Sequence, residues 1–170
     1  MINVKVIFLD IDGVLNNNEF FASNHNDVLN FYKENTDNLN DINISVKRQL
    51  MDIDFDKLRI LKSVIDETRA KVVIISSWKK MRIYPYIVDE LNELGIPIID
   101  YTIDNGSNRG SGIKKYLLEH KVDEYVIIDD DIFDDYDDEI MDNLVKTSFY
   151  DGGLEDKHKE ELIRKLTKKH

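Results

Sequence analysis

The feature that most constrains this chain is a short apolar run, residues 6–9, that ends abruptly in two carboxylates. The run reads Val-Ile-Phe-Leu and continues as Asp10-Ile-Asp12-Gly13. Unbroken apolar runs of this kind are typical of strands buried on both faces of a parallel sheet. Two like charges this close raise each other's pKa unless a cation or hydrogen-bond donors compensate them. The pattern therefore predicts a metal-assisted site at the carboxyl end of a strand, where open α/β sheets bind their ligands.

The rest of the chain predicts one α/β domain, residues 1–170, with a three-layer α/β/α, Rossmann-like architecture. Further apolar runs predict strands at 71–76, 96–99, 125–129 and 144–149. Helical patterns separate or follow these strands at 54–69, 85–95, 113–121 and from Leu154 onward. Strands alternating with helices of this length are typical of right-handed βαβ units, and they predict a parallel sheet of about five strands covered on both faces.

Residues 16–52 do not fit this alternation. They hold ten Asn, and their aromatic side chains are Phe20, Phe21, Phe31 and Tyr32. A connection this long inside a domain is usually either functional or disordered. Two interpretations stay open at this point: a mobile insertion, or a flap or small cap that closes over whatever binds at Asp10 and Asp12.

Composition narrows the class of protein. The formal net charge is −11, and residues 129–142 alone carry −9 of it. Non-specific nucleic-acid binding depends on Lys and Arg neutralising phosphates, so the sequence carries no strong nucleic-acid-binding signal.

We expect no membrane partner, because there is no apolar run of membrane-spanning length and no signal-type segment at the start. The lack of cysteine excludes disulfides and thiolate chemistry and fits a cytoplasmic protein. The oligomeric state is not predicted.

Side chains that can take part in catalysis or ligand binding lie where the predicted strands end. They are two carboxylates after the first strand, a hydroxyl after the second, two carboxylates at the fourth, and two cations near the helix before it: Asp10, Asp12, Ser76, Asp129, Asp130, Arg109 and Lys114. The carboxyl ends of parallel strands share one edge of the sheet, so these groups are expected to converge. Carboxylates, a hydroxyl and a cation form a coherent set for phosphoryl transfer.

In these positions the chain resembles the haloacid dehalogenase (HAD) superfamily of phosphohydrolases. The first motif of that superfamily is an apolar strand ending in Asp-x-Asp-Gly, as at residues 10–13, and its later motifs match the hydroxyl, the cation and the acidic pair. Four segments resemble a narrower branch, HAD domains found alone or fused in RNA-repair proteins: residues 9–16, 67–78, 109–110 and 127–131. The resemblance covers most of the chain except residues 17–52.

The resemblance implies a Mg²⁺-dependent phosphatase. Asp10 would attack phosphorus to form an aspartyl-phosphate, while Asp12 would protonate the leaving oxygen and then take a proton from the hydrolytic water. Mg²⁺, which prefers oxygen ligands, would be held by Asp10, the backbone carbonyl of Asp12, and the pair Asp129 and Asp130. Ser76 and nearby backbone N–H groups, helped by a helix N-terminus, would bind phosphoryl oxygens.

The cation that neutralises the transferring phosphoryl group has competing candidates. HAD proteins commonly use Lys, whereas the narrower branch resembles Arg109-Gly110. We assign the role first to Arg109 and second to Lys114, with Lys115 as a further competitor. For either leading candidate, the alternative without a catalytic role is a solvated residue at a helix end, which is the usual environment of Lys and Arg.

The hydroxyl and the acidic pair each have neighbours that compete for the same role. Ser77 competes with Ser76 as the phosphate-binding hydroxyl. The acids from Asp131 to Asp142 are expected on a solvated face, although Asp131 itself stays open as a site residue. Trp78 is expected to be structural.

The leading functional prediction is a phosphomonoester hydrolase whose substrate is a nucleotide, a nucleic-acid end or a small phosphorylated metabolite. The second prediction is a non-catalytic phosphate-binding, signalling or interaction domain of HAD-like fold. A receiver-type signalling domain would need an acceptor Asp after the third strand and a Lys after the fifth. Here the third strand ends near Asp100, and no Lys ends the predicted strand 144–149 in the right context. Calcium-loop, P-loop and dinucleotide motifs are also absent.

Overall fold

The apolar run at the start of the chain forms the central strand of a parallel sheet. The structure is a computed structural model that describes residues 2–168. Its strands are β1 (Lys5–Leu9), β2 (Lys71–Ile74), β3 (Ile98–Tyr101), β4 (Glu124–Asp129) and β5 (Leu144–Lys146). All neighbouring strands pair in parallel, in the order β3-β2-β1-β4-β5. The predicted fold class is confirmed.

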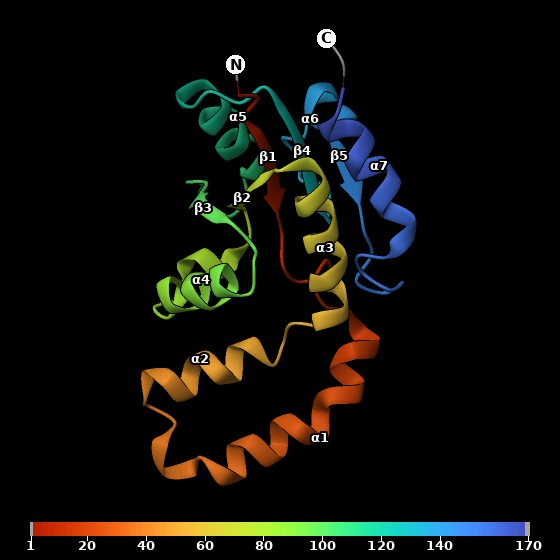
Figure 1. Cartoon of the computed structure of the whole chain (residues 1–170). Coiled ribbons are helices and arrows are strands. Elements are labelled where there is room, and N and C mark those ends of the chain that lie inside the picture. The colour runs from red at the N-terminus through yellow and green to blue at the C-terminus, as the bar shows by residue number, and fades with distance from the viewer. Residues whose placement is uncertain (1, 169–170) are drawn as a thin grey trace.

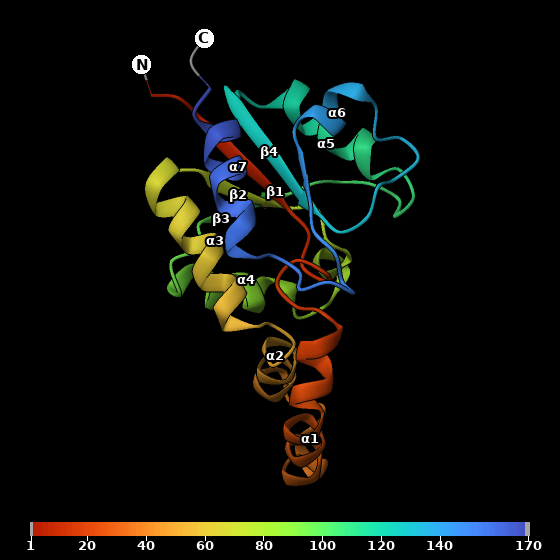
Figure 2. The same ribbon diagram turned by 90° about the vertical axis from the view of Figure 1, so that its right-hand side faces the viewer.

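Side chains of β1 alternate between two separate cores, as the geometry of a strand requires. Ile7 and Leu9 face the larger core, whereas Val6 and Phe8 face the smaller one. Three helices cover the larger core: α3 (Phe55–Thr68), α4 (Tyr84–Glu93) and α7 (Asp156–Leu166). Two helices cover the opposite face: α5 (Arg109–Glu119) and α6 (Asp138–Asp142). The sheet therefore lies between two helical layers (Figures 1 and 2).

Several element boundaries differ from the prediction. Helix α5 begins at Arg109, four residues before the predicted start, and β3 begins at Ile98 rather than at residue 96. Glycines at 110 and 112 weaken the helical pattern there, because glycine has a low helix propensity. The backbone needs Gly110, since a Cβ at this position would lie 2.5 Å from the carbonyl oxygen of Asp135. The short helix α6 lies inside the acidic segment and was not predicted.

Residues 18–50 form a helical arm rather than an irregular loop. The arm consists of α1 (Asn18–Glu34), a 3₁₀ turn at Thr36–Asn38 and α2 (Ile42–Leu50), and it projects beyond the carboxyl ends of the strands (Figure 1). Asn and Asp side chains cap both helices, at Asn17 and at Asp41, which accounts for part of the asparagine content. No residue of α1 is fully buried. Within residues 2–168, no helix combines the length and apolar character needed to cross a membrane.

The sheet reverses its direction of winding between β1 and β4. β1 and β4 are neighbours, yet helices α3 and α4 cover one face while α5 and α6 cover the other. α/β proteins bind ligands at such a switch point, at the carboxyl ends of the strands. β5 ends at Lys146, three residues before the predicted end at residue 149, so a Lys does end this strand. The strand order nevertheless differs from the 2-1-3-4-5 order of receiver domains, so the receiver interpretation fails on topology.

Candidate active site

Three carboxylates meet at the switch point between β1 and β4. Asp10 follows β1 directly, and its backbone N–H donates to the carbonyl of Ile128 across the strand pair at 2.9 Å. Asp129 ends β4, and Asp130 follows it. One carboxylate oxygen from each of the three acids lies within 4.8 Å of the others. The convergence that the sequence predicted over more than 110 residues is therefore present in the structure.

The cluster brings three carboxyl groups together in a largely buried position. Asp10 is 7% exposed and Asp129 is 0% exposed. Burial, and then the neighbouring charge of Asp129, hold the pKa of Asp10 well above its usual value. The pKa of Asp130 is also raised, chiefly by burial. Buried carboxylates of this kind are stable only when a cation or donors compensate them.

The three acids fit a hard divalent cation. Their donors are all carboxylate oxygens, which Mg²⁺ prefers over nitrogen or sulfur. The loop after β1 leaves the required space, because a Cβ on Gly13 would lie 2.0 Å from Oδ2 of Asp130. Gly13 also has φ +80, a conformation that favours glycine. The carboxylate of Asp12 is not part of this cluster.

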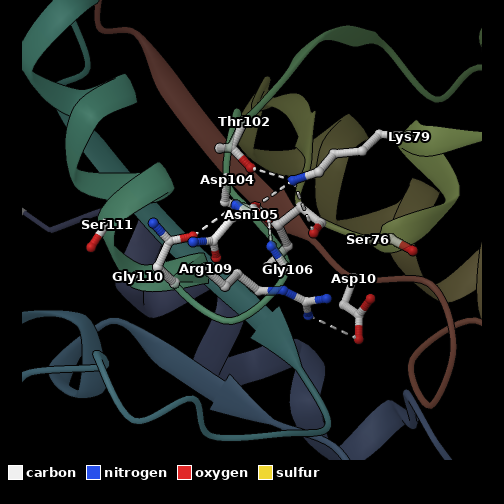
Figure 3. Close-up of polar contacts among 12 residues, drawn as sticks. Asp10, Ser76, Lys79, Thr102, Asp104, Asn105, Gly106, Arg109, Gly110 and Ser111 are labelled. Carbon is white, nitrogen blue, oxygen red and sulfur yellow. Dashed lines mark hydrogen bonds and ion pairs between the residues drawn. The ribbon is translucent and has the colours of Figure 1, made fainter.

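Arg109 is the cation that the fold brings to the cluster. It is the first residue of α5, and its Nη1 lies 2.8 Å from Oδ2 of Asp129 and 3.4 Å from Oδ2 of Asp10. Figure 3 shows the guanidinium directed at Asp10. Burial alone would lower the pKa of Arg109, but Asp10 and Asp129 together raise it above its usual range. The guanidinium carbon lies 4.3 Å from the ring centroid of Phe133, which supports its position.

Lys114 does not point into the cluster. It lies on the next turns of α5 and forms a half-exposed ion pair with Asp137. Lys115 pairs with Glu119 on the helix surface. Of the three predicted cations, the structure therefore places only Arg109 against the carboxylates.

Asp135, expected on a solvated face, caps α5 instead. Its carboxylate accepts hydrogen bonds from the backbone N–H groups of Gly110, at 2.9 Å, and Ser111, at 2.8 Å. Although burial opposes the change, these bonds lower the pKa of Asp135. Because the carboxylate of Asp135 occupies these amides, the N-terminus of α5 does not offer them to a phosphoryl group.

Asp12 lies apart from the cluster and is held by two donors. Its Oδ2 accepts from the indole N–H of Trp78 at 3.2 Å, and its Oδ1 accepts from Nδ2 of Asn16 at 2.9 Å. Its side chain remains exposed. Trp78 is buried as a structural residue would be, but it also contacts the predicted proton shuttle, which the sequence did not indicate.

Ser76 and Lys79 lie on the segment that follows β2. Ser76 is buried, and its hydroxyl oxygen accepts from the backbone N–H of Trp78 at 3.2 Å, whereas Ser77 is exposed. The ammonium of Lys79 lies 2.5 Å from Oδ2 of Asp104 and 3.1 Å from the hydroxyl of Thr102 (Figure 3). This buried pair ties the Ser76 segment to the loop that leads into α5. Burial lowers the pKa of Lys79 despite the opposing effect of Asp104.

Tyr136 is a further contact of the cluster, and the sequence did not point to it. Its hydroxyl donates to Oδ2 of Asp129 at 2.7 Å, and the residue is buried. Tyr136 was not singled out from the sequence, because it lies in a segment dominated by acidic residues. The spacing of Phe133, Tyr136 and Ile140, three and four residues apart, was the available sign that this segment has an inward face.

Comparison with known proteins agrees with this geometry. A family model described as "HAD domain in Swiss Army Knife RNA repair proteins" matches residues 6–158, a range that includes all three clustered acids and Arg109. No curated protein and no solved structure matches the chain with significance.

Proposed function

Because the chain belongs to the family of HAD domains in Swiss Army Knife RNA repair proteins, we propose that it is a Mg²⁺-dependent phosphatase acting through an aspartyl-phosphate. One observation carries the proposal. A buried carboxylate, Asp10, stands at the end of the central strand with two further acids and a guanidinium in contact range. Groups suited to act as nucleophile, metal ligands and charge-neutralising cation thus lie together at the carboxyl ends of β1 and β4, as phosphoryl transfer requires.

The reaction proposed for these residues has two steps. A carboxylate oxygen of Asp10 attacks phosphorus, and the bond from phosphorus to the ester oxygen breaks while Asp12 gives that oxygen its proton. Asp12 then takes a proton from water, which attacks phosphorus and releases inorganic phosphate from Asp10. The exposed position of Asp12, outside the buried cluster, suits a group that exchanges protons with the leaving alcohol and with water.

The remaining residues bind and neutralise charge. Asp10, Asp129 and Asp130 would hold Mg²⁺, with the backbone carbonyl of Asp12 as a further ligand. When bound, the ion supplies the positive charge that lets an anionic nucleophile approach an anionic phosphate. Arg109 would neutralise charge on the transferring phosphoryl group, and the buried hydroxyl of Ser76 would help to bind its oxygens.

The substrate is proposed to be a phosphorylated nucleic-acid end. The family's occurrence in RNA repair proteins supports this class over the two others that the sequence left open, a free nucleotide and a small phosphorylated metabolite. A panel of 3′- and 5′-phosphorylated oligonucleotides, nucleotides and sugar phosphates would rank the three classes.

The test is hydrolysis of a generic aryl phosphate. We expect activity with Mg²⁺, its loss on chelation, and a loss of at least about 1000-fold in Asp10→Asn, because the nucleophile is removed. Activity that survives Asp10→Asn would contradict the assignment. A folded protein without activity on any phosphate ester in Mg²⁺ would instead favour a non-catalytic HAD-like domain.

A matched pair of variants tests the cation. Arg109→Ala should lower kcat by about 100-fold, since one donor to the transition state is lost, whereas Lys114→Ala should stay within a few-fold of the parent protein. Both variants remove a cation from α5, so equal losses would contradict the role given to Arg109.

A further inference from the structure

Four aromatic rings make consecutive contacts where the arm leaves the core. Phe20 and Phe21 lie in the first turn of α1, and Phe149 and Tyr150 lie between β5 and α7. The ring centroids are 6.2 Å apart for Phe20 and Phe21, 6.0 Å for Phe21 and Phe149, and 5.2 Å for Phe149 and Tyr150. We call these four residues the aromatic platform.

The platform is fixed to the loops that carry the candidate active site. Thr147, two residues before Phe149, donates its backbone N–H to the carbonyl of Asp129 at 3.0 Å and its hydroxyl to the carbonyl of Gly13 at 2.6 Å. The backbone N–H of Asn18 donates to the carbonyl of Phe149 at 3.0 Å. Figure 2 shows the connection from β5 to α7 beside the start of α1. The segments that carry the rings therefore lie next to the loops of Asp12 and Asp129.

Exposure separates the platform from the aromatic contacts around Phe8 in the core. Phe8 packs edge-on against Tyr116 and Tyr125 and is 0% exposed, as expected for rings that stabilise a core. In contrast, Tyr150 is 81% exposed, and the three phenylalanines of the platform are only partly buried. A tyrosine left in water contributes little to folding, so its ring is free to bind a ligand.

We propose that the aromatic platform stacks an unpaired nucleobase carried by the phosphate ester, a step that rests on the proposed function. Stacking on aromatic rings accepts every base, because each base has a π-face. The charge of the protein supports stacking of a base over binding of the sugar-phosphate backbone of the substrate. The segment 129–142, which contributes −9, begins at the active site and repels a long phosphate chain. A base beside the scissile phosphate is the part of the substrate that an acidic surface tolerates best.

The test compares substrates that differ only by a base. A short single-stranded oligonucleotide with a terminal phosphate is made with either a normal or an abasic terminal nucleotide, and kcat/KM is measured for each. The parent protein should prefer the base-bearing substrate by about ten-fold or more. Tyr150→Ala should bring this ratio close to one, mainly through KM, and Tyr150→Trp should restore it. Tyr86→Ala removes a tyrosine that is 46% exposed on α4, and it should leave the ratio unchanged.

Several results would overturn the inference. A ratio near one in the parent protein, or an unchanged ratio in Tyr150→Ala, means that the platform does not bind the base. If glycerol phosphate is hydrolysed while both oligonucleotides are inert, the proposed phosphatase stands and the base site falls. If no phosphate ester is hydrolysed, the proposed function falls, and the base site is tested separately by the anisotropy of labelled oligonucleotides, with and without the base, on Asp10→Asn protein.

A mononucleotide that shows the same ratio identifies free nucleotides as the source of the base, whereas a larger ratio for the oligonucleotide identifies strand ends.

Discussion

Asp12 illustrates how a single side chain is prepared for its proposed chemistry. Trp78 donates to one of its oxygens and Asn16 to the other, so its orientation is set before any substrate arrives. The contact with Trp78 spans 66 residues of sequence, and no local pattern marks it. The carboxyl ends of β1 and β4 could be predicted from the sequence, and with them Asp10, Asp12 and Asp129. The side chains that orient Asp12 and Asp129, which are Trp78 and Tyr136 respectively, reach the site only through the tertiary fold.

Removing the indole donor should selectively weaken proton transfer. Trp78→Phe keeps an aromatic ring in the core but loses the N–H group, so we expect kcat to fall about ten-fold on alkyl phosphates. A nitrophenyl phosphate should lose much less, because its leaving oxygen needs little protonation. The measurement is the ratio of the two kcat values. Equal losses on both substrates would show that Trp78 acts only through packing.

The raised pKa of Asp10 makes a prediction for metal-free protein. Burial and Asp129 stabilise the protonated form in the folded state, so this contribution to stability is complete below the unfolded pKa of about 3.9 and is lost as pH rises through the raised pKa. In chelator, the free energy of unfolding of the parent protein should fall relative to that of Asp10→Asn as the pH rises above about 4. Thermal melts of both proteins measure the difference, and added Mg²⁺ should reduce it. Parallel profiles would contradict the prediction.

At the scale of elements, the sequence predicted the order of strands and helices better than their ends. The N-cap Asp54 and the early Pro85 placed α3 and α4 correctly, because both signals are local. The start of α5 was missed, since its cap comes from Asp135, 25 residues away. The helices of the arm were not predicted, because α1 has no fully buried residue and therefore lacks the apolar stripe of a core-facing helix.

Helix α5 should depend on this distant cap. Asp135→Asn weakens two charge-assisted bonds to the first amides of the helix and should lower the free energy of unfolding by about 1 kcal/mol. Because Arg109 begins the same helix, kcat/KM should also fall by a few-fold. Denaturant melts and aryl phosphate kinetics check both effects. The control is Asp134→Asn, an exposed neighbour whose replacement removes the same charge. Equal effects of the two substitutions would indicate that charge, rather than capping, matters.

At the scale of the whole molecule, charge limits how a nucleic acid is bound. The 23 Lys and Arg are outnumbered by 34 Asp and Glu, so the net charge of −11 opposes binding of a phosphate backbone. We therefore expect KM for phosphorylated oligonucleotides to change little as the strand lengthens from about three to about fifteen nucleotides. The dependence of KM on salt should likewise correspond to about one or two neutralised phosphates. A KM that improves steadily with length would reveal a basic path on the surface.

The two ends of the arm meet at a single side chain. Nδ2 of Asn16 donates both to Asp12 and to the carbonyl of Asp52, where the chain returns, and the backbone N–H of Asp54 donates to the carbonyl of Leu15 at 2.8 Å. The segments that flank residues 18–50 are therefore joined to each other, and the arm packs on the larger core through Ile42, Val46 and Leu50 of α2. An insertion anchored in this way can be replaced by a segment of another length, because the change costs little in loop-closure entropy. Evolution or design can thus alter what reaches the candidate active site while leaving its carboxylates in place.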